Sequence, residues 1–119
     1  MFRGSLVALV TPMTESGDID HVAFGRLLDM RVLACGLTLT PERAAAAGAT
    51  MVPLDTLLRD CDVVSVNLPL SDKTRGFLGA RHLALMKPTA FLINSARGPI
   101  VDEAALVAAL RERRIAGAA

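Results

Sequence analysis

One stretch near the carboxyl end of the chain most constrains the fold. Residues 90–93 form a short apolar run, polar Asn94 and Ser95 end it, and Arg97 follows. Short apolar runs of this kind are typical of parallel strands that are buried on both faces. Asp102 is then predicted to cap a helix with apolar residues on one side. The pattern therefore predicts strand, turn and helix, which is the repeating unit of an α/β sheet.

Arg97 is the first candidate for a functional residue. It is expected at the carboxyl end of a buried strand, where open α/β sheets bind their ligands. A guanidinium in that position can donate two parallel hydrogen bonds to a carboxylate. Position alone leaves a second interpretation open, in which Arg97 is an exposed loop residue without a ligand.

Short apolar runs alternate with helical patterns along the whole chain. Strands are expected at residues 6–10, 30–35, 51–52, 62–66, 90–93 and 115–119, and helices at 21–28, 41–47, 54–58, 80–86 and from 103 onward. Right-handed crossovers then predict one Rossmann-like α/β domain over residues 1–119, with a doubly wound, mostly parallel sheet in three layers.

The alternation also predicts an order for the sheet. The strands at 6–10 and 30–35 are expected near its middle, with 51–52 on one side and 62–66, 90–93 and 115–119 on the other. The last strand is unfinished, so the sheet is expected to be incomplete at the C-terminus. An open edge there would allow a homo-oligomer to form.

The composition excludes several classes of partner. Thirteen basic and twelve acidic residues leave a net charge of +1, which indicates no nucleic-acid or membrane partner. No apolar run approaches the roughly 20 residues of a membrane span, and the apolar run within residues 1–10 is too short for a signal peptide. Cys35 and Cys61 lack metal-ligand spacing, which leaves reduced thiols or one disulfide. We expect a cytoplasmic protein without a metal site.

Four runs of residues are familiar in their order and spacing: Leu39-Thr40-Pro41-Glu42-Arg43-Ala44, then 62–70 (DVVSVNLPL), 84–88 (ALMKP) and 93–103 (INSARGPIVDE). From about residue 30 to 119 the sequence resembles the cofactor-binding domain of D-isomer-specific 2-hydroxyacid dehydrogenases. The resemblance implies NAD or NADP, bound across the carboxyl ends of the strands. It also implies hydride transfer to or from a 2-hydroxy or 2-keto acid.

The resemblance assigns roles to residues that match the family's motifs. Arg97 would be the catalytic residue that binds the substrate carboxylate. The residues expected near the cofactor are Leu68, Pro69, Thr74, Asn94, Ser95, Ala96 and Arg97. Asn94 has an alternative role as a strand-end cap for backbone groups.

The sequence also departs from the family's pattern. The G-x-G-x-x-G turn that cradles the pyrophosphate is missing, and residues 11–17 (TPMTESG) stand in its place. Pro12 lacks an amide and Glu15 would repel phosphate, so weak or lost dinucleotide binding is expected. The acidic residue that holds the adenosine ribose falls on Gly36, which suggests either tolerance of NADP or a weak site. The family's common histidine is Asn67 here.

The first 29 residues resemble a different family. Residues 1–13 (MFRGSLVALVTPM) and 17–20 (GDID) are similar to the start of dihydrodipicolinate synthase and its class I aldolase relatives. Those enzymes are (β/α)8 barrels that use a Schiff-base lysine, whereas Lys73 and Lys87 both lie in the dehydrogenase-like part. We expect a chimera or truncated fusion joined at Asp29-Met30.

Three functional hypotheses follow. The first is a partial NAD(P)-binding domain of an oxidoreductase, inactive alone, because the family's catalytic histidine and glutamate are expected beyond residue 119 and neither His21 nor His82 matches them. The second is a non-catalytic chimeric α/β scaffold. The third is a dihydrodipicolinate synthase-like lyase fragment, a hypothesis that rests on the resemblance of residues 1–29.

Overall fold

The computed structural model describes residues 5–7, 31–36 and 38–119. The strands are β1 (Ser5–Val7), β2 (Leu33–Ala34), β3 (Thr50–Met51), β4 (Cys61–Val66), β5 (Phe91–Asn94) and β6 (Gly117–Ala118). The helices are α2 (Pro41–Ala46), α3 (Leu54–Asp60), α4 (Ala80–Leu83) and α5 (Glu103–Arg111), with a 3₁₀ turn η1 at Gly98–Ile100. The expected helix at 21–28 and the turn at 11–17 lie outside the described residues.

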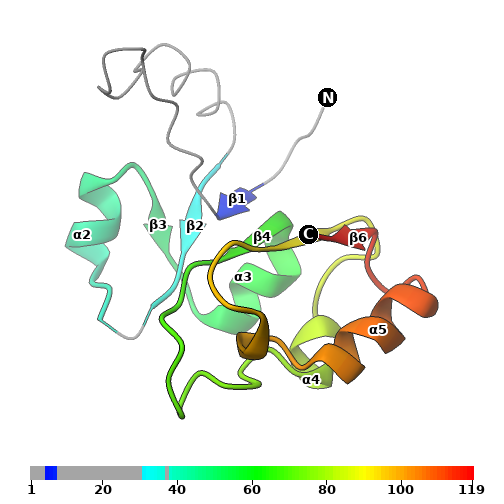
Figure 1. Ribbon diagram of the computed structural model, residues 1–119. Helices are drawn as coiled ribbons and strands as arrows, with labels where there is room; N and C mark the ends of the chain where they lie inside the picture. The colour runs from blue at the N-terminus through cyan, green and yellow to red at the C-terminus, as the bar shows by residue number, and fades with distance from the viewer. Residues whose placement is uncertain (1–4, 8–30, 37) are drawn as a thin grey trace, which may run out of the picture.

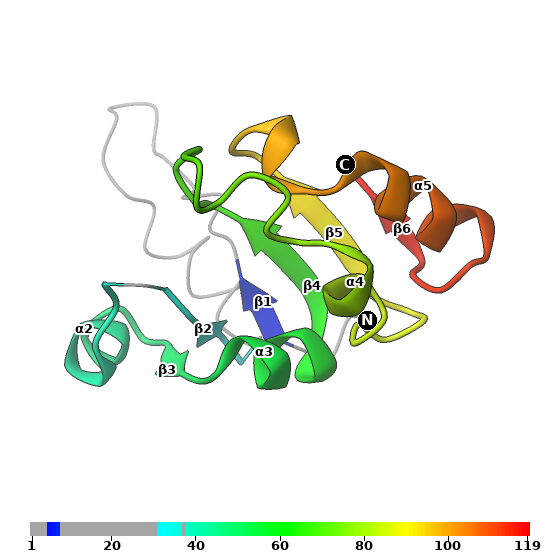
Figure 2. The same ribbon diagram turned by 90° about the horizontal axis from the view of Figure 1, so that it is seen from below.

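Every described strand pairing is parallel, as the alternation of strands and helices predicts. β1, β4, β5 and β6 form one sheet in that order, and β2 pairs with β3 (Figure 2). β2 also contacts β1, so the expected order of the six strands is confirmed.

The expected single sheet and the length of its second strand are wrong for the described residues. β2 and β3 bond to one another rather than into the larger sheet. Of the described residues 31–35, only Leu33 and Ala34 belong to β2. At its carboxyl end, Gly36 starts a turn in which the Leu39 amide donates to the Gly36 carbonyl at 3.3 Å.

The core lies between the sheet and helices α3, α4 and α5. Val64 and Val66 of β4 and Leu92 of β5 face these helices and are buried with Leu83 of α4 and Ala109 of α5. The connections from β3 to β6 all advance in one direction along the sheet, so right-handed crossovers put their helices on one face. Figure 1 shows α4 and α5 on the same side of the strands.

The prediction that the run at 90–93 is buried on both faces is wrong. Phe91 is 40% exposed and Ile93 is 37% exposed, whereas Leu92 between them is 1% exposed. Strand residues alternate between faces, and Phe91 and Ile93 point away from α3, α4 and α5. The Phe91 ring instead lies across Gly117 of β6, where an added Cβ would come within 3.0 Å of the ring.

Local capping chemistry explains α2 and the short α4. The Thr40 hydroxyl accepts from the Arg43 amide, Pro41 opens α2, and Gly48 follows it with a φ of 71°, as predicted. The expected helix at 80–86 is too long, because α4 ends at Leu83. The chain then runs to Met86 in tighter turns, with hydrogen bonds between residues i and i+3. Pro88 disfavours a helical residue before it, which ends the segment.

None of the helices in the described part of the chain is long and apolar enough to cross a membrane.

Candidate functional site at the carboxyl ends of β4 and β5

Polar side chains link the carboxyl ends of two adjacent parallel strands. Ser95, just after β5, donates through Oγ to Oδ1 of Asn67, just after β4, at 3.2 Å. The Asn67 amide donates in turn to Oγ of Ser65 at 3.3 Å. Asn67 and Ser95 are both exposed, so this edge presents hydroxyl and amide groups to solvent.

Asn94 caps the end of β5 and shapes the loop that follows. Its Oδ1 accepts from the Ala96 amide at 3.1 Å, and its Nδ2 donates to the Arg97 carbonyl at 2.9 Å. Both ends of the Asn94 amide are therefore used within this loop, which agrees with the capping role left open above. A cofactor contact of Asn94 itself stays a prediction.

Arg97 lies on this capped loop and is exposed. Its Nη1 donates to the neighbouring Ala96 carbonyl at 2.8 Å. Among the described residues, no carboxylate forms an ion pair with it. Because a guanidinium has five N–H donors, most of them remain available to an anionic ligand. Ala96, half-buried, lies directly before it.

Thr74 organises the loop after β4. It is only 4% exposed, and its hydroxyl donates to the Pro69 carbonyl at 2.7 Å and accepts from the Ser71 amide at 2.8 Å. The expected direct approach of Thr74 to a cofactor is untested, and its contacts show a residue that holds Pro69 in position. Pro69 is exposed and Leu68 is half-buried.

The loops after β4 and β5 are bound to each other, which the sequence did not indicate. The Gly76 amide donates to the Pro99 carbonyl at 2.8 Å, the Leu78 amide to the Ile100 carbonyl at 3.1 Å, and the Asp102 amide to the Leu78 carbonyl at 3.1 Å. Backbone bonds of this kind leave no signature in side-chain patterns. They fix the Thr74 loop against the Arg97 loop.

His82 and Lys87, which could take part in acid–base or nucleophilic chemistry, make contacts away from the ends of β4 and β5. The His82 ring, in α4, stacks on Phe77 with 5.6 Å between centroids. Lys87 Nζ lies 2.8 Å from Oδ1 of Asp62 and 2.8 Å from the Asp60 carbonyl, so it is engaged at the start of β4. His21 lies outside the described residues.

Within the described residues, the structure contains neither a metal-binding cluster nor a bond between the two cysteines. No group of His, Cys, Asp and Glu side chains among them could hold a metal ion. Cys35 and Cys61 are not joined in a disulfide.

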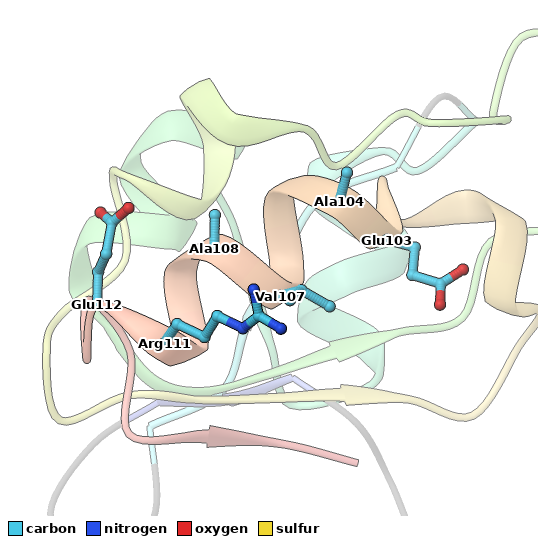
Figure 3. A pocket seen from close by; sticks show the side chains of 6 residues that line it. All are labelled: Glu103, Ala104, Val107, Ala108, Arg111 and Glu112. Atoms are coloured by element: carbon cyan, nitrogen blue, oxygen red, sulfur yellow. The ribbon is translucent and has the colours of Figure 1, made fainter.

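A shallow pocket of about 700 Å³ lies on the outer surface of α5 (Figure 3). Its lining residues are Glu103, Ala104, Val107, Ala108, Arg111 and Glu112. All of them come from one helix and its C-cap. Ligand sites enclose most of a small molecule between several elements, so the strand ends are the better candidate.

Known proteins match this architecture. Residues 21–119 match the family model described as D-isomer specific 2-hydroxyacid dehydrogenase, NAD binding domain. The chain belongs to this family.

Two solved structures and one sequence relative are similar to most of this chain. The NAD-complexed D-isomer specific 2-hydroxyacid dehydrogenase of Lactobacillus delbrueckii ssp. bulgaricus superposes with a TM-score of 0.72 at 36% identity, covering 81% of this chain and 29% of that one. The Aquifex aeolicus D-lactate dehydrogenase, complexed with NAD and lactic acid, gives 0.72 at 30% identity, covering 81% and 28%. Glyoxylate reductase of Thermococcus onnurineus is 44% identical over 110 residues, covering 84% of this chain and 33% of the relative.

The family match corrects the expected junction. The matched region begins at residue 21, nine residues before the predicted boundary at 30. Nothing in the comparisons supports a dihydrodipicolinate synthase-like start or a chimera. The strand β1, within residues 1–29 and before the matched region, pairs with β4, as expected of a first strand that joins the sheet. The chain spans about a third or less of the length of these dehydrogenase relatives.

Proposed function

We propose that the chain binds a nicotinamide dinucleotide at the carboxyl ends of β4 and β5. It would thereby serve an oxidoreductase that moves a hydride between this cofactor and a 2-hydroxy or 2-keto acid. The observation that supports this most strongly is Arg97, an exposed guanidinium on a loop that is capped by Asn94 and that no described carboxylate neutralises.

The groups at this edge suit the nicotinamide half of such a cofactor. Ser95 and Asn67 offer hydroxyl and amide groups, and half-buried Leu68 and Ala96 offer apolar contact beside them. The cofactor supplies the hydride chemistry when it is bound. Arg97 would orient the carboxylate of the acid by two parallel hydrogen bonds, so that its reacting carbon faces the ring.

We infer that these 119 residues bind the cofactor but do not turn over the acid. Reduction of a keto acid needs a proton donor at the new hydroxyl, and general acid catalysis contributes about 10²–10⁴-fold to rate. His82, in α4, is the one histidine among the described residues, and its ring stacks on that of Phe77. No described histidine stands beside Arg97.

Titration of the chain with NADH, followed by nicotinamide fluorescence, tests the proposal. We expect saturable binding that Ser95→Glu weakens at least about tenfold, because it adds a negative charge where the cofactor would lie. The matched control is Ala104→Glu on α5, also exposed, which should leave the affinity unchanged. No binding, or equal loss in both variants, would reject the proposed site.

A further inference from the structure

The carboxyl end of β2 has a second set of residues that the function above does not use. In Rossmann-like folds an acidic side chain at this place bonds the adenosine ribose hydroxyls of NAD, and an arginine nearby accommodates the extra phosphate of NADP. Here Cys35 and Gly36 follow β2 directly, and Gly36 supplies no carboxylate. The group that excludes a ribose phosphate by charge repulsion is therefore missing.

An arginine reaches the same turn from the other side. Arg43, in the first turns of α2, donates through Nη1 to the Thr38 carbonyl at 3.2 Å, two residues after Gly36. Its side chain is exposed, and no described carboxylate pairs with it. The nearest acid in sequence is Glu42, in the first turn of α2, where hydrogen bonding to its own backbone amide and to the Thr40 hydroxyl lowers the pKa of its carboxyl.

From these observations we propose that the site prefers NADP to NAD, with Arg43 binding the phosphate on the adenosine ribose. This inference rests on the proposed dinucleotide function. A phosphate of about two negative charges would gain charge-assisted hydrogen bonds from the guanidinium. NAD carries a hydroxyl there, which would have no carboxylate acceptor and no negative charge to attract the Arg43 guanidinium.

Gly36 allows a direct exchange of preference. Its backbone lies outside the left-handed region, and an added Cβ would meet only the Leu39 Cβ at 3.4 Å and the Leu39 amide nitrogen at 4.0 Å. A side chain therefore fits at this position. Gly36→Asp restores the missing carboxylate, and Gly36→Asn gives the same shape without the charge.

Dissociation constants of NADPH and NADH, measured by titration for each variant of the full chain, test the proposal. The chain should bind NADPH about tenfold or more tighter than NADH. Gly36→Asp should reverse that order, Gly36→Asn should not, and Arg43→Gln should weaken NADPH alone. The control is Arg59→Gln, at the end of α3 just before β4 begins, where the strands start rather than end.

The outcomes separate this inference from the proposed function. Tighter binding of NADH than of NADPH would overturn the NADP preference and leave the dinucleotide function standing. An equal loss of both nucleotides in Arg43→Gln would overturn the role of Arg43. No binding of either nucleotide would reject the proposed function itself. Because Arg43 is exposed, Arg43→Gln is expected to fold, and it tests the proposal even if Gly36→Asp does not fold.

Discussion

At the scale of single residues, Asn94 determines the conformation of the Arg97 loop. Replacing it with alanine removes the acceptor of the Ala96 amide and the donor to the Arg97 carbonyl. We expect Asn94→Ala to lower the free energy of unfolding by about 1–2 kcal/mol, because two partly exposed hydrogen bonds are lost. Amide exchange at Ala96 should accelerate. Asn67→Ala is the matched control, since the Asn67 amide bonds only side chains. Unchanged exchange at Ala96 in Asn94→Ala would contradict the capping role.

Cys35 gives the stability a pH dependence at high pH. Partial burial raises the pKa of its thiol above the ordinary value of 9.0. The unfolded chain then loses this proton at lower pH than the folded chain, so the free energy of unfolding falls as pH rises from about 9 toward the folded pKa. Urea unfolding from pH 7 to 10 should show this fall in the wild type and a smaller one in Cys35→Ser. Parallel curves for the two proteins would rule out the contribution of Cys35.

At the scale of elements, the two faces of β5 should differ in their cost of truncation. Leu92→Ala removes a side chain that is 1% exposed in the core beneath α4 and α5, and should cost about 2–5 kcal/mol. Ile93→Ala removes the same number of carbons from a side chain that is 37% exposed. It should cost less than half as much. Equal costs in denaturant unfolding would mean that the outer face of β5 is as closely packed as the inner one.

Two ion pairs, one between α3 and α4 and one between the segment after α4 and β4, should also differ in their contribution to stability. Arg81 of α4 contacts Asp55 of α3 at 2.6 Å with 67% of its side chain exposed, so Arg81→Met should cost less than about 1 kcal/mol. Lys87 bonds Asp62, whose second carboxylate oxygen is buried without a partner, and the Asp60 carbonyl. Lys87→Met should cost about 2–3 kcal/mol, since it leaves that carboxylate partly buried and unpaired. Urea titration of both variants checks this order, and a larger loss in Arg81→Met would contradict it.

At the scale of the whole molecule, the sequence predicted the features that depend on neighbouring residues, such as helix capping. It did not predict the features that depend on how distant segments pack, such as the exposed face of β5. Thr40, Pro41 and Gly48 predict α2 because a cap, a first-turn proline and a left-handed glycine act on their own neighbours. The exposed face of β5 depends instead on the direction in which successive crossovers run. The bonds from Gly76 to Pro99 depend on two loops meeting. The Arg97 position was predictable because the carboxyl ends of parallel strands share one edge.

The most direct test of the central claim, that the edge formed by the ends of β4 and β5 is the dinucleotide site, is a nuclear magnetic resonance titration of the isotopically labelled chain with NADH and NADPH. We predict that the largest amide shifts occur at Leu68, Ser95 and Arg97 and that Val107 and Arg111 on α5 stay unchanged. Shifts that cluster on α5, or none at any residue at saturating nucleotide, would contradict the account.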